Sequence, residues 1–238
     1  MLKTDFHMHT AEDPIDFHIK YSARDLIKHC AKLGYEVLSI TNHAFKPKHK
    51  PLFNKDLERF AKKNGILLIP GMEARIDNKD VVILNIKEST KKPMTFRRLE
   101  MLKKEGAFLI APHPMYKLHS LNKFIFKTID LFDAIEYSHS YTKYFNLNKW
   151  AMEIADEYNK PVVGTSDCHF LQQLNKTYTM VDADLNKDSV LEAIRKKKIK
   201  LVTRPLTTFE FASIMSKMTF KDIFLKTFFY AEGNGYHK

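Results

Sequence analysis

Asp5-Phe6-His7-Met8-His9-Thr10 lies close to the start of the chain and places two histidines at alternate positions. In an extended strand, alternate side chains point to the same face, so the imidazoles of His7 and His9 can reach one ion at the C-terminal end of the strand. Imidazole nitrogens are common ligands of transition metals. The hexapeptide therefore predicts a strand that ends in a metal site.

Five later segments repeat this arrangement, because each is a short apolar run followed by residues that can bind a metal. The polar residues that follow these runs are His43, Glu73, His113, His139, Asp167 and His169. Amphipathic segments between the runs are expected to form helices over residues 23–33, 52–63, 96–104 and 146–158. Strands that alternate with helices every ~25 to 35 residues predict a parallel α/β sheet with helices outside.

The same polar residues favour a closed barrel over an open sheet. In a (β/α) barrel the C-terminal ends of all strands meet at one face, so residues that follow different strands can form one site. The length of 238 residues suits one such domain. We expect the barrel to span residues 1–206, and residues 207–238 to form a helical extension packed on its exterior. A membrane-surface or oligomer role for this basic, Phe-rich tail is the alternative.

Composition argues against several classes of protein. Neither a GxGxxG motif nor a P-loop is present, and seven glycines are few for Gly-rich phosphate loops. Two cysteines do not suggest a disulfide scaffold, and no leader precedes the first strand, so a cytoplasmic location is expected. No apolar run approaches the ~18 residues of a membrane-spanning helix. The net charge of +11 favours an anionic partner, although lysines spread over a solvated surface would give the same charge.

The histidines that follow strands are numerous enough to indicate a metal centre. One such histidine is more often a hydrogen-bonded structural residue than a ligand, but six of the eleven histidines occupy these positions. Imidazoles and carboxylates together suit Zn²⁺, Mn²⁺ or Fe²⁺ better than Ca²⁺ or Mg²⁺. A catalytic zinc usually takes three protein ligands, so this inventory predicts two or three divalent ions, with Glu73 suited to bridging two of them.

These motifs resemble those of the PHP family, named for polymerase and histidinol phosphatase, from residue 3 to about residue 170. The matching segments are His7-Met8-His9-Thr10, Thr41-Asn42-His43, Gly71-Met72-Glu73, Pro112-His113-Pro114, Glu136-Tyr137-Ser138-His139 and Ser166-Asp167-Cys168-His169. The resemblance implies a distorted seven-stranded (β/α) barrel, similar to a TIM barrel, that holds two or three metal ions. The sequence departs from the family pattern at Asn42, where many members carry Asp.

The resemblance also implies how the ligands divide among the ions. One ion would be surrounded by His7, His9, Glu73 and Asp167, and a second by Glu73, His113 and His139. A third would bind His43 and His169. Asp13 is expected to complete this third site, and Glu12, Asp16 and His18 are alternatives to it.

Clustered divalent ions activate water and stabilise charge on phosphoryl oxygens. The expected reaction is therefore hydrolysis of a phosphate monoester or diester by a metal-activated hydroxide, with Glu73 and Asp167 as catalytic residues. Candidates for contacts to substrate phosphate, or else ordinary surface charges, are Arg75, Lys46 and Arg204. The substrate would be a phosphorylated small molecule or a nucleotide, and nucleic acid is a further candidate partner.

Three other functions fit parts of the pattern. An amidohydrolase also places histidines in a barrel, but it usually uses a carbamylated lysine or a different order of ligands. A basic barrel that binds nucleic acid without catalysis would explain the charge but not the six histidines. A nuclease would use both the basic surface and the metal ions. Cys168 lies between two proposed ligands and is expected to be a buried structural thiol.

Overall fold

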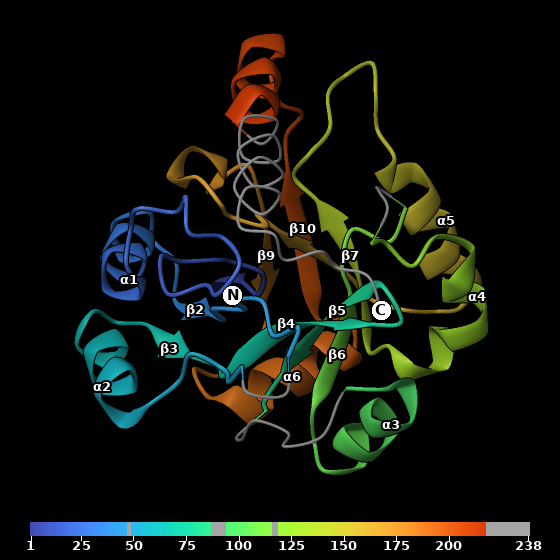
Figure 1. The fold of residues 1–238 in the computed structure, drawn as a ribbon, viewed down its shortest axis with the longest axis horizontal. Helices are drawn as coiled ribbons and strands as arrows, with labels where there is room; N and C mark the ends of the chain where they lie inside the picture. Colours follow the sequence, from blue (N-terminus) through green and yellow to red (C-terminus); the bar gives the residue numbers. More distant parts are fainter. Residues whose placement is uncertain (47–48, 87–93, 116–118, 218–238) are drawn as a thin grey trace, which may run out of the picture.

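The described strands form two five-stranded sheets, and the described helices lie outside them (Figure 1). The structure is a computed structural model that describes residues 1–46, 49–86, 94–115 and 119–217. The first sheet has the order β10 (Ile199–Thr203), β9 (Thr177–Val181), β1 (Leu2–Asp5), β2 (Val37–Leu38) and β3 (Leu67–Leu68). The second has the order β4 (Gly71–Ile76), β5 (Lys79–Leu84), β6 (Phe108–Ala111), β7 (Ala134–Ser138) and β8 (Val162–Thr165).

Parallel pairing occurs in both sheets, as the alternation of strands and helices predicted. In the first sheet β1, β2 and β3 are parallel neighbours, and in the second β6, β7 and β8 are. Antiparallel pairing joins β9 to β1 and β10, and β5 to β4 and β6. The α/β class expected from the sequence is therefore confirmed, whereas the antiparallel pairs depart from the expected parallel sheet.

The described strands form two separate sheets and no single closed one. The break falls at Pro70, between β3 and β4, where the chain lacks the N–H that would continue a ladder. Two isolated parallel bridges connect the sheets beyond this break, one between Met8 and Cys168 and the other between His43 and Glu73. The sheets thus meet along a seam, which we define as the region where β1 and β2 end beside β4 and β8.

The helices are α1 (Ala23–Lys32), α2 (Lys55–Lys63), α3 (Phe96–Lys104), α4 (Ile125–Thr128), α5 (Asn148–Glu157) and α6 (Lys187–Arg195). Residues 208–217 are also helical. Short 3-10 helices span Asn122–Phe124, Ile129–Leu131 and Leu171–Gln173. None of the described helices is long and apolar enough to cross a membrane.

Most helix bounds follow from residues that cap the ends. α1 begins after Ser22, whose side chain accepts from the N–H of Asp25. α3 has the expected bounds. The helix expected from residue 52 begins later, at Lys55, because the Asn54 side chain accepts from the N–H groups of residues 56 and 57 and thereby caps it. Of the expected C-terminal extension, only residues 207–217 lie within the described part of the chain.

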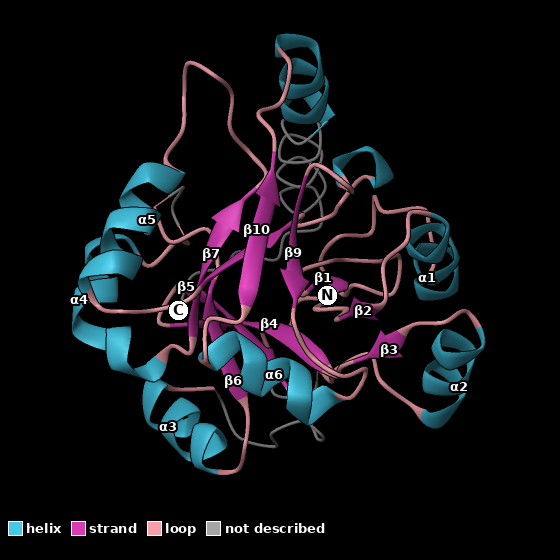
Figure 2. Ribbon diagram, turned by 180° about the vertical axis from the view of Figure 1, so that it is seen from behind, coloured by secondary structure: helices cyan, strands magenta, loops and turns pink. Residues whose placement is uncertain are grey.

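Side chains from both sheets pack into a shared core. Val37 of the first sheet and Val82, Phe108 and Val163 of the second belong to one apolar cluster, to which α6 contributes Ile194. In the view from behind, α6 lies across the strands at one end of the molecule (Figure 2). Burial of this surface holds the two sheets against each other.

β8 approaches β9 and β10 closely at Gly164. A Cβ at this position would lie 2.4 Å from Cδ1 of Leu201, 2.9 Å from Cγ2 of Thr177 and 3.0 Å from the Tyr178 carbonyl oxygen. The Thr179 hydroxyl bonds to the Gly164 backbone, accepting from its N–H at 2.8 Å and donating to its carbonyl at 3.0 Å. The absence of a side chain is therefore what lets the second sheet pack against the first here.

Gly164→Ala should lower the free energy of unfolding by about 1–3 kcal/mol, because the added methyl group has no space. Thermal denaturation measures this change as a lower melting temperature. Leu201→Ala removes the nearest atom, so the Gly164→Ala, Leu201→Ala double variant should lose less stability than the sum of the two single changes. Additive losses would show that the close approach at Gly164 does not constrain the packing.

Candidate metal centre

The polar residues that follow separate strands come together at the seam, around the carboxylate of Glu73. Its Oε2 lies 3.3 Å from Nε2 of His7, 3.4 Å from Nε2 of His9 and 3.2 Å from Nε2 of His43. Its Oε1 lies 3.5 Å from Nε2 of His113. β1 and β2 lead into three of these histidines, whereas β4 and β6 supply the carboxylate and the fourth. The site is therefore built from both sheets.

Asp167 joins the same centre from the end of β8. Its Oδ1 lies 3.5 Å from Nε2 of His7 and 3.4 Å from Nε2 of His9. Asp167 has a φ of 44° and His113 a φ of 29°. These are left-handed backbone conformations, which residues other than glycine seldom adopt. Such local strain persists where the surrounding structure enforces it, and it often marks functional sites.

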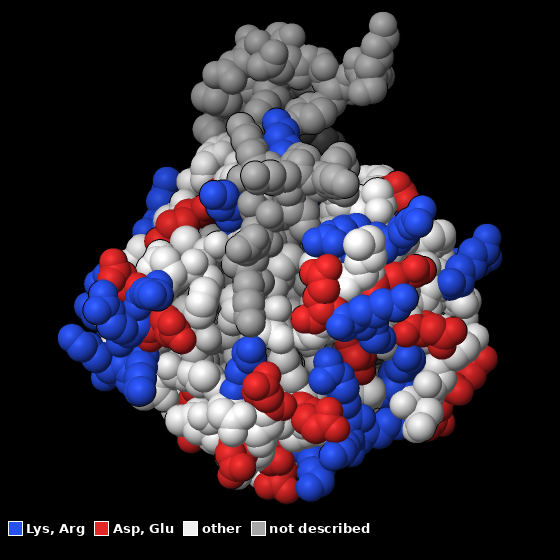
Figure 3. All heavy atoms as spheres, turned by 90° about the horizontal axis from the view of Figure 1, so that it is seen from below, with Lys and Arg blue, Asp and Glu red and all other residues white. Residues whose placement is uncertain are grey.

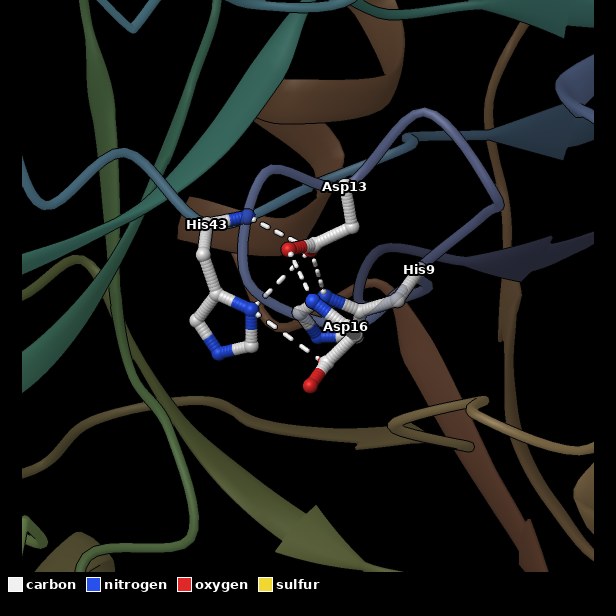
Figure 4. Close-up of side chains that lie close together, drawn as sticks. All are labelled: His9, Asp13, Asp16 and His43. Atoms are coloured by element: carbon white, nitrogen blue, oxygen red, sulfur yellow. Dashed lines mark hydrogen bonds and ion pairs between the residues drawn. The ribbon is translucent and has the colours of Figure 1, made fainter. Parts of the chain in front are cut away.

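The loop after β1 brings Asp13 and Asp16 to the centre (Figure 4). Asp13 Oδ2 accepts from the backbone N–H of His43 at 2.8 Å and lies 3.0 Å from Nδ1 of both His9 and His43. Asp16 Oδ2 lies 2.8 Å from Nε2 of His169 and 3.4 Å from Nδ1 of His43. Both aspartates thus belong to the cluster, and Asp16 is the one that contacts both histidines of the expected third site.

His139 is buried nearby but belongs to none of the three groups that could hold an ion within the described residues. These groups are His9, Asp13, Asp16 and His43; His7, Glu73 and His113; and His7, His9 and Asp167. Nε2 of His139 instead lies 3.0 Å from the amide nitrogen of Gln173. Gln173 is fixed in this orientation because its Oε1 accepts from the N–H groups of His169 and Phe170 at 2.8 and 2.7 Å.

Glu136 is a functional candidate that sequence reasoning did not single out. Its side chain is fully buried, and its Oε2 lies 3.1 Å from Nδ1 of His7 and accepts from the N–H of His113 at 3.1 Å. Its Oε1 accepts from the Thr165 hydroxyl at 2.6 Å. A carboxylate held this way fixes the orientation of the His7 ring. The sequence signal was present, since a carboxylate inside an apolar strand is rarely accidental.

Asn42 is also fixed by its contacts. Its Oδ1 accepts from the N–H of Thr10 at 2.9 Å, and its Nδ2 donates to the Thr10 hydroxyl at 2.9 Å. Asn42 therefore holds the chain just after the His-x-His pair. A carboxylate at this position could accept from the Thr10 N–H but could not donate to the Thr10 hydroxyl, so the amide suits this contact.

The residues of the centre fit divalent metal ions. Nε2 of His7 and Nε2 of His9 are buried without a hydrogen-bond partner, and both face the carboxylates of Glu73 and Asp167. Buried polar atoms are almost always satisfied, so two such nitrogens side by side need an explanation. Imidazole nitrogens with carboxylate oxygens form the donor set of Zn²⁺, Mn²⁺ and Fe²⁺ sites. An ion between these atoms would satisfy them together.

The electrostatics of the metal-free centre favour protons on His7, His9, His43 and His113, whereas burial lowers the pKa of His139 to about 4 and also lowers the pKa of His169. Burial by itself would lower the pKa of His43 and His113, but Glu73 and neighbouring acids outweigh it and raise the pKa of His43 to about 10 and that of His113 to about 9. Burial would raise the pKa of Glu73 and Asp167, but His7 and other imidazoles hold both well below their ordinary range. An ion that binds here must displace protons, so binding should weaken at low pH.

The three expected phosphate-contacting residues differ in their surroundings. Arg75 forms a forked ion pair with Asp80, at 2.7 and 3.1 Å, and its guanidinium lies 3.9 Å from the centre of the Phe45 ring. Phe45 in turn packs edge-on against the ring of His43, with centroids 4.7 Å apart. Lys46 is exposed. Arg204 forms a forked pair with Glu210. Of the three, Arg75 is therefore the one that these contacts link to the centre, through the ring of Phe45.

Comparison with known proteins supports this class of fold. Residues 146–199 match the family model described as PHP-associated, which confirms the resemblance to the PHP family that the sequence motifs indicate. Among curated proteins, none matches the chain in sequence.

Several solved structures share the fold. PsfC from Pseudomonas syringae has a TM-score of 0.57 at 15% identity, over 95% of this chain and 98% of that one. A protein from Bifidobacterium adolescentis, whose structure is described as that of a metal-dependent phosphoesterase, has a TM-score of 0.53 at 13% identity, over 83% of this chain and 96% of that one. A lesion-specific endonuclease from Pyrococcus furiosus has a TM-score of 0.57 at 16% identity, over 84% of this chain but 57% of the endonuclease. This chain thus spans less than two thirds of that enzyme.

The protonated imidazoles predict how the stability of the metal-free protein depends on pH. The pKa values of His43 and His113 are raised above 6.5, so the stability that these groups contribute is complete below about pH 6.5 and is lost as the pH rises to 9 and 10. The melting temperature of chelated protein should fall across this range, and the fall should be smaller in His43→Gln. If the melting temperatures of the two proteins depended equally on pH, the raised pKa of His43 would be contradicted. Protein loaded with Zn²⁺ or Mn²⁺ should show a weaker dependence, because the ions replace the protons.

Proposed function

We propose that the chain is a metal-dependent phosphoesterase of the PHP type, which hydrolyses a phosphate monoester or diester. The position of Glu73 carries this proposal, because its buried carboxylate lies between 3.2 and 3.5 Å from four imidazoles. A carboxylate with ring nitrogens on both oxygens is suited to bridging two divalent ions. The family match over residues 146–199 and the shared fold support the same class.

The proposed cofactors are two or three ions of Zn²⁺, Mn²⁺ or Fe²⁺. The first would be held by His7, His9, Glu73 and Asp167, and the second by Glu73 and His113, with His139 joining once its contact with Gln173 is broken. The third would be held by His43, His169 and Asp16, while Asp13 orients His9 and His43. When bound, such ions lower the pKa of water and stabilise charge on phosphoryl oxygens.

The two proposed catalytic carboxylates have different roles because their exposure differs. The Glu73 side chain is 3% exposed and is enclosed by imidazoles, so its role would be to hold the ions. The Asp167 side chain is 22% exposed and can be reached from outside the centre. We therefore assign to Asp167 the proton transfer that accompanies attack on phosphorus and departure of the leaving oxygen.

The proposal extends to the architecture of the chain. β3 and β4 can be described as one strand interrupted at Pro70, and the Met8–Cys168 and His43–Glu73 bridges would join the two sheets into one distorted barrel. We propose that residues 1–206 form this PHP-type domain and that residues 207–238 extend it. Two buried free thiols, at Cys30 and Cys168, fit a reducing compartment such as the cytoplasm.

The substrate class has two candidates. A phosphorylated small molecule or a nucleotide fits the small buried centre, whereas a nuclease activity is favoured by the net charge of +11 and by the likeness to an endonuclease fold. Arg75 is the proposed contact to substrate phosphate, because its side chain is 26% exposed beside the centre. Lys46 and Arg204 are proposed to contribute to attraction of the anion.

Elemental analysis of protein purified without chelators should find two or three transition-metal ions per chain, and the protein should release phosphate from a panel of phosphoesters. Glu73→Gln should lose bound metal and reduce hydrolysis by at least about 100-fold, since even residues that only orient ligands contribute 10–100-fold. Glu153→Gln, an exposed change on α5, is the matched control and should retain both properties.

Two results would count against the proposed function. One is a metal-free protein that hydrolyses no phosphoester after reloading with Zn²⁺ or Mn²⁺. The other is hydrolysis of amide or C–N substrates in the same panel with none of phosphoesters, which would favour an amidohydrolase.

Arg75→Ala should raise the KM for a phosphomonoester by about tenfold and lower kcat less, because a charged hydrogen bond to phosphate contributes mainly to binding. Removing Arg75 leaves Asp80 buried without its partner, so Asp80→Asn is combined with it to preserve folding. Arg98→Ala on α3 is the control, since Arg98 pairs only with Glu105 at the surface. An unchanged KM in the double variant would exclude Arg75 from substrate binding.

A further inference from the structure

The loop between β7 and α5, residues 139–147, presents aromatic side chains to solvent. Tyr144 is 95% exposed and Phe145 is 52% exposed. Phe209, at the start of the helical residues 208–217, is 82% exposed. Single exposed apolar residues are common on protein surfaces, but a group of large aromatic ones often marks a binding surface. We call Tyr144, Phe145 and Phe209 the aromatic platform.

Hydrogen bonds hold the loop in one conformation. The Thr142 hydroxyl accepts from the N–H groups of Tyr144 and Phe145 at 3.3 and 3.1 Å, and the Thr142 N–H donates to the Phe145 carbonyl at 2.9 Å. At the base of the loop, the Asn148 side chain bonds to both the N–H and the carbonyl of Ser138 at 2.9 Å. The two rings therefore stand on an ordered turn, which reduces the entropy lost when a ligand stacks on them.

The aromatic platform rises from the end of the sheet that carries the metal centre. The loop begins at His139, and the parallel strands β6, β7 and β8 all end on this side. The Leu206 N–H donates to the Tyr141 carbonyl at 2.9 Å and Thr142 bridges to Leu206, which joins the loop to the segment that leads to Phe209. In Figure 1 the loop and helix 208–217 project together at the same side of the molecule.

Net charge alone does not identify the partner, because Lys and Arg alternate with Asp and Glu on the face seen in Figure 3. The local composition of the loop is more informative. Exposed Lys143 precedes Tyr144 and Phe145 in the sequence, and exposed Lys149 follows them in the first turn of α5. Lysine is depleted in the cores of protein interfaces, whereas cations beside exposed aromatic rings are typical of surfaces that bind single-stranded nucleic acid. A small molecule would require a concave pocket, which a tip residue exposed at 95% does not provide.

We propose that the aromatic platform binds single-stranded nucleic acid by stacking bases on Tyr144 and Phe145, with Phe209 extending the surface and the two lysines contacting phosphates. This inference rests on the proposed function, since it identifies the phosphodiester that would reach the metal centre as part of a nucleic-acid strand. Stacking on aromatic rings tolerates any base, so binding should depend little on sequence.

The test is fluorescence anisotropy with a labelled 20-nucleotide single strand of mixed sequence, using full-length protein in chelator so that no cleavage occurs. The wild type should bind, and its affinity should fall as salt rises from 50 to 200 mM. Tyr144→Ala, Phe145→Ala should weaken binding by about tenfold or more, and Tyr144→Trp should restore it in part. Phe126→Ala, an exposed aromatic on α4, should bind like the wild type.

A second measurement separates this proposal from the phosphoesterase function. Metal-loaded wild type and the double variant should hydrolyse a small chromogenic phosphodiester at equal rates, since that substrate does not reach the loop. If neither protein hydrolyses this substrate or any member of the phosphoester panel, the proposed function fails, and the anisotropy measurement then tests strand binding independently.

The proposal would be overturned if the double variant bound the strand with wild-type affinity. It would also be overturned if the wild type did not bind the strand at 50 mM salt. A wild-type dimer that the double variant converts to monomer would assign the surface to a second copy of the chain. Binding to vesicles of anionic phospholipid without binding to the single strand would assign it to a membrane surface.

Discussion

The site depends on enclosing the charge of Glu73 within the protein. A buried carboxylate carries a large desolvation penalty unless positive charge or hydrogen-bond donors surround it. In this chain the compensation comes from ring nitrogens on both of its oxygens, contributed by segments far apart in sequence. The need to compensate the buried charge of Glu73 therefore constrains the positions of β1, β2 and β6 relative to β4.

Residues around the centre hold these rings in place. Glu136 and Asp13 each face the Nδ1 atom of a histidine, so that its Nε2 atom points inward. Gln173 fixes the turn that follows β8 through the backbone of His169. The left-handed conformations of His113 and Asp167 lie at the ends of β6 and β8, where the chain must turn at once to direct its side chains inward. The strain at these residues and the order of the centre are linked, because the surrounding contacts maintain both.

Much of the fold and most of the centre could be predicted from local patterns. The alternate spacing of His7 and His9 and the recurrence of His, Asp and Glu after apolar runs depend only on strand geometry. The choice between Asp13 and Asp16 could not be predicted, because it depends on a turn in which Asp13 Oδ1 accepts from the N–H of Ile15 and of Asp16. The contact of Glu136 with His7 joins residues 129 positions apart, which no local pattern encodes. The separation into two sheets at Pro70 depended in the same way on how distant strands pair.

The seam between the sheets has a consequence for the life of the protein in a cell. Under the proposed metal binding, the first and third ions would contact residues from both sheets, so they would act as removable cross-links between the two sheets. The unfolded chain has no such arrangement and cannot hold these ions in the same way. Depletion of the metal would then expose the chain to proteases as well as stop its chemistry. The supply of metal would thereby set the abundance of the protein together with its activity.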